Sequence, residues 1–231
     1  MVSQLLTALL VTGALAALAY ALGMISRSGA LGGLLVGTTI YAFLGPRALA
    51  IFALFVVGGS ILTRFGYASK ESTGTAQEHG GRRGARNALA NCAVAALCAI
   101  LAAATGSEPF MAAFVASLGA AFADTAESEI GQLFSRTPRL ITTLQRVQPG
   151  TDGAISLPGT LGGVGAAGLT AALGLALGML ETPPSAILVA IAAFLGTVVD
   201  SLIGSLSPRA GNELTNVLCT LVAALLALTF V

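Results

Sequence analysis

Charged residues are scarce in this sequence. Lysine, arginine, aspartate and glutamate together make up 9% of its 231 residues, whereas soluble domains carry about 25%. Hydrophobic residues make up 55% of the chain, and its mean hydropathy is +0.89. This composition excludes a soluble globular domain and is typical of a polytopic membrane protein. We therefore expect an all-α bundle of transmembrane helices.

Histidine, cysteine and tryptophan are also rare or missing. His79 is the only histidine, which excludes a metal site built from several histidines. Cys92, Cys98 and Cys219 lie inside apolar runs, and their spacing matches neither a disulfide framework nor a zinc site. Tryptophan is absent and glycine is abundant, with 29 residues. Such a composition favours helices that pack closely through small residues.

Long apolar segments predict a single transmembrane domain over residues 1–231. A helix needs about 20 residues to cross the hydrocarbon core. We predict about eight spans, with six as the lower bound, at residues 2–22, 30–44, 47–62, 85–105, 109–127, 158–180, 185–206 and 213–230. The second and third segments are short, and Gly45-Pro46-Arg47 between them predicts either a full or a re-entrant hairpin. We favour two tightly joined spans, because a re-entrant hairpin would leave Arg47 at membrane depth.

The basic residues lie almost entirely on one side of this eight-span arrangement. Alternate loops contain ten of the 11 lysines and arginines, and the opposite side contains only Arg47. The ten are Arg27, Arg64, Lys70, Arg82, Arg83, Arg86, Arg136, Arg139, Arg146 and Arg209. Because positively charged loops remain on the cytoplasmic side, both termini are predicted to be non-cytoplasmic. We expect a prokaryotic plasma or inner membrane, with the polar site on its cytoplasmic face.

Three carboxylates lie close together at the cytoplasmic end of the fifth predicted span. Asp124 and Glu127 are three residues apart and share a helix face, whereas Glu129 points about 140° away from Asp124 in a regular helix. Negative charge is costly in a spanning helix and is disfavoured at a helix C-terminus, so we interpret these residues as functional. Oxygen ligands of this kind predict a Mg²⁺ site.

Asp200 is a further candidate, at the inner end of the seventh span. Apolar residues flank it on both sides. An acidic side chain within a membrane span is a functional candidate, and the alternative is a structural hydrogen bond to a neighbouring helix.

A glycine- and proline-rich segment, residues 149–160, opens the sixth span. Glycines allow a ligand to approach the backbone closely, and free N–H groups at a helix N-terminus bind phosphate. The residues assigned to this role are Gly150, Thr151, Asp152, Gly153, Ser156, Gly159 and Thr160. The segment is not a Walker A motif, because the Gly-Lys-Ser/Thr ending is missing. An ordinary turn with capping hydroxyls would give a similar pattern.

Other polar residues are predicted to face the same site. Arg82 and Arg83 precede the fourth span and can bind phosphate bidentately, although arginines next to a membrane also set topology or contact anionic lipid. The remaining candidates for substrate or phosphate contacts are Asn87, Asn91, Arg139, Thr142, Thr143, Ser201 and Asn216.

In their order, these motifs resemble the integral membrane proteins related to phytyl-phosphate kinase. The matching blocks fall within residues 80–216 and are Gly80–Asn91, Asp124–Thr125, Ser128–Gly131, Pro138–Thr143, Gly150–Thr160 and Asp200–Gly204. The first three spans match only in hydropathy. The chain departs from the family pattern at Asn87, Glu127 and Asp152, where glutamine, a small residue and serine are usual.

The resemblance implies particular roles for the carboxylates. It implies that Asp124, Glu129 and Asp200 are the catalytic residues and metal ligands, with Glu127 as an additional candidate. For Glu129 to reach the site, the helix would have to unwind near Ser128, and we predict that it does.

The resemblance also implies an activity. It implies transfer of a phosphoryl group to a phytyl or polyprenyl monophosphate from a nucleoside triphosphate, with CTP as the expected donor and Mg²⁺ as the cofactor. The expected partners are therefore an isoprenoid phosphate and a nucleotide, and not nucleic acid. Two alternatives remain: a cytidylyltransferase that joins a nucleotide to a lipid phosphate, and a transporter of an anionic solute. The nearly uncharged outer face argues against the transporter, which needs polar groups along its path.

Overall fold

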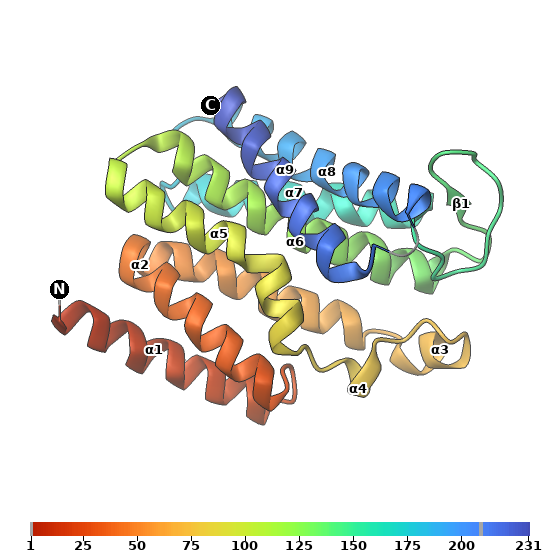
Figure 1. Cartoon of the computed structure of the whole chain (residues 1–231), viewed down its shortest axis with the longest axis horizontal. Helices are drawn as coiled ribbons and strands as arrows, with labels where there is room; N and C mark the ends of the chain where they lie inside the picture. Colours follow the sequence, from red (N-terminus) through yellow and green to blue (C-terminus); the bar gives the residue numbers. More distant parts are fainter. Residues whose placement is uncertain (1, 208–209) are drawn as a thin grey trace.

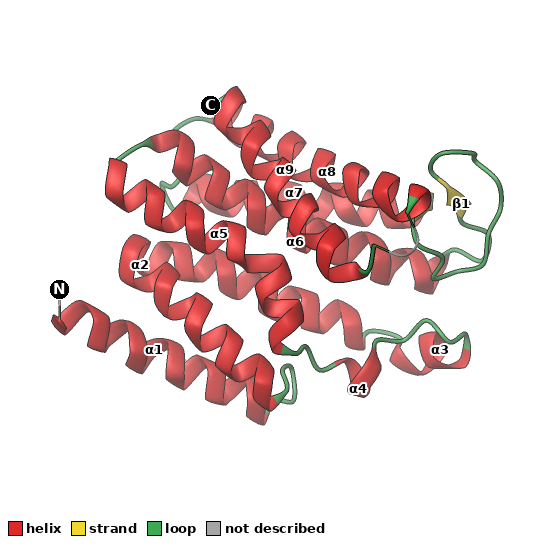
Figure 2. Cartoon of the chain, viewed as in Figure 1, coloured by secondary structure: helices red, strands yellow, loops and turns green. Residues whose placement is uncertain are grey.

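The computed structural model describes residues 2–207 and 210–231 and confirms a polytopic helical bundle (Figures 1 and 2). Within those residues, seven helices are long and apolar enough to cross a membrane. They are α1 (Val2–Ala21), α2 (Arg27–Arg64), α5 (Ala85–Thr105), α6 (Glu108–Phe134), α7 (Leu157–Ala176), α8 (Pro183–Leu206) and α9 (Asn212–Phe230). The short elements are α3 (Tyr67–Ser72), α4 (Glu78–Gly81), β1 (Arg139–Leu140) and β2 (Ala154–Ile155). Arg209, one of the ten basic loop residues, lies outside the described residues.

Helix α2 folds back on itself at Gly45. The backbone there has φ 77° and ψ −165°, outside the helical region, and Pro46 begins the second half. The end of α2 lies close to its start: Arg64 Nη2, in the last turn of α2, donates to the carbonyl oxygen of Leu22, in the turn that precedes α2 (2.9 Å). Figure 1 shows the two halves, in orange, as a hairpin. The two short segments predicted for this region are therefore two antiparallel helices, so the described residues run eight times along the bundle.

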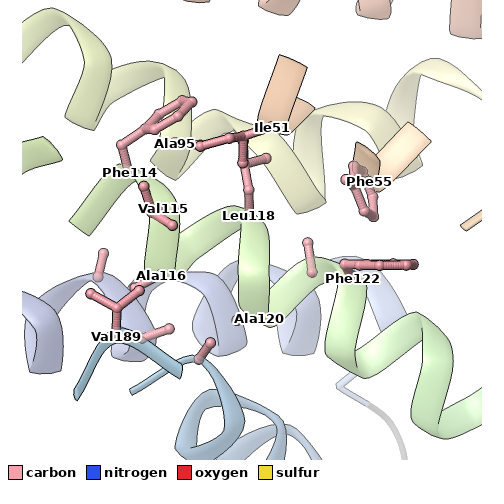
Figure 3. Close-up of a cluster of buried hydrophobic side chains, with 14 of the residues drawn as sticks. Ile51, Phe55, Ala95, Phe114, Val115, Ala116, Leu118, Ala120, Phe122 and Val189 are labelled. Carbon is pink, nitrogen blue, oxygen red and sulfur yellow. The ribbon is translucent and has the colours of Figure 1, made fainter. Parts of the chain in front are cut away.

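Helix α6 is the centre of the bundle. In the most apolar 18-residue stretch of α6, 78% of the residues are buried, whereas 11% are buried in the corresponding stretch of α1. It packs against α2, α5, α7, α8 and α9. Figure 3 shows Leu118 of α6 pointing toward Ile51 of α2, while Ala116 lies near Val189 of α8. Because α6 is surrounded on every side, the carboxylates near its end lie inside the bundle rather than on its surface.

Helix α6 is longer than predicted, and the prediction that it unwinds near Ser128 is wrong. The helix continues without a break to Phe134, seven residues beyond the predicted end of the span at 127. Its last turns are held by neighbours: Glu129 forms a buried ion pair with Lys70, and Gly131 packs against Gly159 of α7. A polar sequence at the end of a span therefore marks a packed helical turn here, not a loop.

The two ends of the bundle differ in polarity. Both termini lie at one end, and α3, α4 and the loop with β1 lie at the other (Figure 1). Of the described lysines and arginines, only Arg47 lies at the end with the termini, beside Gly178 in the α7–α8 connection. The charge asymmetry of the sequence thus corresponds to two physically distinct ends of the molecule.

Candidate active site

A large polar cavity lies at the end of the bundle that carries α3, α4 and β1. Its volume is about 720 Å³, within the range of roughly 300–1,000 Å³ that is usual for ligand pockets. Its walls come from the segment between α3 and α5, the starts of α5 and α9, the last turns of α6 and α8, and the segment before α7. The predicted site residues that line it are Arg82, Arg83, Asn87, Asn91, Asp124, Glu127, Glu129, Gly150, Thr151, Asp152, Gly153, Ser156, Asp200, Ser201 and Asn216. Motifs far apart in the sequence therefore meet in one place.

The structure does not bring Arg139, Thr142 or Thr143 to the cavity lining. Arg139 Nη1 donates to the carbonyl oxygen of Leu144 within its own loop (2.7 Å). The hydroxyl of Thr142 shares a hydrogen bond with that of Ser205 at the end of α8 (2.6 Å). The side chains of Arg139 and Thr142 therefore hold the loop between α6 and α7 in place instead of lining the polar cavity.

Gly159 and Thr160 lie behind the cavity wall rather than in it. A Cβ on Gly159 would lie 2.6 Å from the carbonyl oxygen of Glu127, so only glycine lets α7 approach α6 this closely. Thr160 Oγ1 donates to Glu127 Oε1 (3.3 Å) and orients that carboxylate. The predicted phosphate-binding segment is thus divided. Residues 149–156 reach the cavity, and the following helical turn forms the α6–α7 interface.

Gly153 anchors the segment before α7 to α8. Its φ is 73°, and a Cβ there would lie 2.3 Å from the backbone nitrogen of Ser205. Glycine is required for both reasons, the left-handed backbone and the close approach. This contact fixes the neighbouring residues Thr151 and Asp152 at the cavity.

One wall of the cavity carries acidic side chains. Asp124 and Glu127 of α6 and Asp200 of α8 are close enough to act on one another electrostatically. Among the described residues, the buried Oδ1 of Asp200 has no hydrogen-bond partner. A buried carboxylate oxygen in this condition is costly unless a ligand or ion satisfies it.

The three carboxylates predicted as metal ligands do not form one cluster. Within residues 2–207 and 210–231, no three side chains of histidine, cysteine, aspartate or glutamate are arranged to hold a metal ion. Glu129 also lines the cavity, but its carboxylate is taken up by the ion pair with Lys70. Asp124 and Asp200 remain as a pair. Mg²⁺ commonly binds one or two carboxylates together with phosphate oxygens of a substrate, so the pair suits such a site.

Glu129 forms a buried ion pair with Lys70. Lys70 Nζ donates to Glu129 Oε2 and to the carbonyl oxygens of Leu62 (3.1 Å) and Thr63 (2.8 Å). The two charged side chains are only 1% and 5% exposed. All three donors of the ammonium group are therefore used. From the sequence, Lys70 was identified only as one of the basic loop residues that set the membrane topology. No local spacing connects it to Glu129, which is 59 positions away.

Arg83 is a half-buried cation that lines the site. Its Nη2 donates to Thr125 Oγ1 (3.2 Å), and its guanidinium carbon lies 5.2 Å from the centre of the Phe55 ring. In the part of the chain that the structure describes, its buried Nη1 has no hydrogen-bond partner, and neither has Oδ1 of Asn87. Burial lowers the pKa of Arg83, and the negative charges of Glu129 and Asp124 oppose that shift. Arginine keeps its charge in proteins, so the group remains a cation.

Helix N-termini add to the positive character of this wall. Helices α5 and α9 both begin at the cavity, and their N-cap residues, Gly84 and Gly211, have no side chain to cap them, although the N–H of Ala85 donates to Ser28 Oγ (3.4 Å). Free backbone N–H groups and the positive end of a helix dipole favour an anion. The cavity therefore combines anion-binding groups with carboxylates, which suits a phosphate bound together with a divalent cation.

The sequence matches the family model described as integral membrane protein DUF92 over residues 10–224. The chain belongs to this family. A DUF92 relative from Synechocystis, an uncharacterized membrane protein, is 37% identical over 84% of this chain and 77% of its own length. Protein VTE6, chloroplastic, of Arabidopsis thaliana is 34% identical over 78% of this chain and 56% of that protein. An uncharacterized membrane protein of Methanocaldococcus jannaschii is 34% identical over 87% of this chain and 84% of its own length. No solved structure matches.

The DUF92 match confirms the family resemblance seen in the motifs and extends it. It begins at residue 10 and so includes most of α1 and all of α2, which the motifs had matched only in hydropathy. The first two long helices are therefore part of the region that the family model matches.

Proposed function

We propose that this DUF92 protein is an integral membrane kinase that phosphorylates a phytyl or polyprenyl monophosphate to the diphosphate. One observation carries the proposal: a polar cavity at one end of a membrane bundle, in which Asp200 Oδ1, Arg83 Nη1 and Asn87 Oδ1 are buried and have no partner among the described residues. The similarity to Protein VTE6 and the resemblance to proteins related to phytyl-phosphate kinase support an isoprenoid phosphate as the acceptor.

The residues of the cavity suit phosphoryl transfer. This reaction depends mainly on positioning and on stabilising negative charge. Arg82, Arg83 and the N-termini of α5 and α9 hold phosphate oxygens. Asp124 and Asp200 would hold Mg²⁺, which when bound neutralises charge on the donor phosphates. The acceptor is already a phosphate, so the cavity needs no strong general base.

The donor in this proposal is a nucleoside triphosphate, with CTP favoured by the family resemblance. The cavity end faces the cytoplasm, because it carries nearly all the basic residues. Nucleotides enter from this side, and the isoprenoid acceptor reaches the cavity from the membrane. The proposed location is a prokaryotic plasma or inner membrane.

Product analysis with two labels tests this function. The protein, purified into lipid nanodiscs with Mg²⁺, is supplied with each nucleoside triphosphate in turn and with prenyl monophosphates of several lengths. We expect label from the γ-phosphate, and none from the α-phosphate, in a prenyl diphosphate. Transfer of the α-label would identify a cytidylyltransferase and contradict the proposal. So would the absence of any prenyl diphosphate in every combination.

A further inference from the structure

A second cavity, of about 280 Å³, lies between α1, both halves of α2 and the first turns of α5. We call it the α1–α2–α5 groove. Its walls are almost entirely apolar and include Leu15, Leu18 and Phe52. Among the described residues, its polar lining consists of Thr12, Arg83 and Asn87. Thr12 is already satisfied, because its hydroxyl bonds to the carbonyl oxygen of Ala8 (2.6 Å), so the free polar groups are at one end.

The groove adjoins the polar cavity. Arg83, Gly84 and Asn87 line both spaces, so the groove and the cavity meet at these three residues. At this junction Arg83 Nη1 and Asn87 Oδ1 are buried, and neither has a hydrogen-bond partner within the described residues. The junction therefore offers a cation and an amide to a polar group, directly at the mouth of an apolar channel.

Glycines form one wall of the groove. Gly29, Gly33 and Gly37 are four residues apart and so lie along one face of the first half of α2. A Cβ on Gly29 would meet the Arg83 carbonyl oxygen at 2.1 Å, and one on Gly37 would meet Thr12 at 3.3 Å. A Cβ on Gly33 would meet no described atom within 4 Å. Gly33 therefore borders the open part of the groove.

We propose that the α1–α2–α5 groove holds the isoprenoid chain of the acceptor, with its phosphate at Arg83 and Asn87. The inference rests on the proposed function for the identity of the head group. A linear hydrocarbon with one terminal phosphate matches the apolar walls, the single polar end and the unpaired Nη1 of a charged arginine. The amide of Asn87 offers both a donor and an acceptor to the same head group. A neutral acyl chain of the bilayer would leave Arg83 Nη1 unsatisfied.

Filling the groove at Gly33 tests the proposal by chain length. Gly33→Leu places a side chain in open space, so we expect the KM for phytyl monophosphate to rise at least about tenfold. The shortest, five-carbon prenyl monophosphate is expected to change by less than about twofold, because it reaches the junction without filling the groove. The matched control is Gly165→Leu on the exposed face of α7, where a Cβ also meets no described atom within 4 Å. Equal effects of Gly33→Leu on short and long acceptors would overturn the proposal.

Photo-crosslinking without nucleotide separates this inference from the proposed function. The probe is a prenyl monophosphate with a diazirine at the end of its chain, and adducts are mapped by mass spectrometry. We expect adducts on α1 and α2, near Leu15 and Phe52, that unlabelled phytyl monophosphate suppresses and that phytol does not. Such adducts without kinase activity would reject the function and keep the groove as the binding site. Kinase activity with adducts spread over α7, α8 and α9 would reject the groove and keep the function.

Discussion

Single residues at the cavity end of the bundle are of two kinds. Asp200 and Arg83 each have a buried polar atom without a partner among the described residues, whereas Lys70 and Glu129 satisfy each other. A buried polar atom without a partner destabilises the fold, so a ligand is the natural partner of the first pair. A buried ion pair instead holds two elements together. Substitutions in the two pairs should therefore differ in their effects.

Asp200→Asn is expected to abolish activity without harming the fold. The amide keeps the shape of the side chain, but it removes the negative charge that we assign to metal binding. We expect kcat to fall by at least about 100-fold, while the melting temperature stays the same or rises. Kinetic assays and thermal unfolding in nanodiscs measure the two effects. Glu181→Gln, in the connection at the opposite end, is the control and should change neither. A loss of stability that parallels the loss of activity would contradict the assignment.

Lys70→Met is expected to destabilise the protein. It leaves the Glu129 carboxylate buried without its partner, which typically costs about 3–5 kcal/mol. The double variant Lys70→Met with Glu129→Gln removes the uncompensated charge and should recover a large part of the loss. Chemical denaturation of the two variants and of wild type compares these free energies of unfolding. If the single variant is as stable as the double one, the ion pair does not support the end of α6.

The sequence predicted which acidic residues lie at this end, but it did not predict their partners. Asp124 and Asp200 were found because carboxylates in apolar spans are unusual. The family pattern placed Glu129 beside them, although its position in a regular helix already pointed it elsewhere. The structure keeps the helix regular, and Lys70 occupies that other side. Such a partner cannot be read from spacing, because it depends on how two distant segments pack.

At the scale of helices, glycines determine how closely the elements that build the site approach one another. The α6–α7 interface depends on Gly159, Gly162 and Gly163, each of which faces atoms of α6. A Cβ on Gly159 would meet a backbone carbonyl oxygen, which cannot move aside as a flexible side chain can. The close contact at Gly159 therefore determines where Glu127 lies and, with it, the position of the acidic side chains of the cavity.

Gly159→Ala is expected to destabilise the bundle and lower activity together. The added methyl group would force α7 away from α6 at a cost of about 1–3 kcal/mol. Gly165→Ala, in the same helix but facing open space, is the matched control and should be neutral or slightly stabilising. Thermal unfolding and turnover of both variants check the difference. Wild-type behaviour of Gly159→Ala would show that the interface has room that the structure does not indicate.

Hydropathy predicted the helices well but not their ends. The Gly45-Pro46 break and the two short halves of α2 followed from local rules for glycine and proline. The last seven residues of α6 did not, because polar residues normally signal the end of a span. Here they remain helical, since the bundle encloses a polar cavity that is lined by side chains such as Ser128 and Gln132.

At the scale of the whole molecule, the two cavities follow the polarity of the bundle. The polar cavity lies at the basic end, and the apolar groove extends from it between helices that span the membrane. The count of spans predicted that the motifs would meet at one end. The distances across the cavity were not predictable, because hydropathy does not fix the rotation of each helix about its axis.

Labelling of single cysteines is expected to place the cavity end in the cytoplasm. The three native cysteines are buried, so a reporter on the surface reacts alone in the presence of a membrane-impermeant maleimide. Thr143→Cys, in the exposed loop near β1, should react in inside-out vesicles and not in intact spheroplasts. Glu181→Cys, in the α7–α8 connection, should show the reverse. Labelling of Thr143→Cys in spheroplasts would contradict the predicted orientation.

The most direct measurement is a phosphoryl transfer assay with γ-labelled CTP, Mg²⁺ and phytyl monophosphate, comparing wild type with Asp200→Asn and Glu181→Gln. We predict labelled phytyl diphosphate from wild type and Glu181→Gln, and at least about 100-fold less from Asp200→Asn. Equal product from wild type and Asp200→Asn would contradict the cavity as the site of transfer. No labelled diphosphate from wild type, with CTP or with any other nucleoside triphosphate, would contradict the kinase itself.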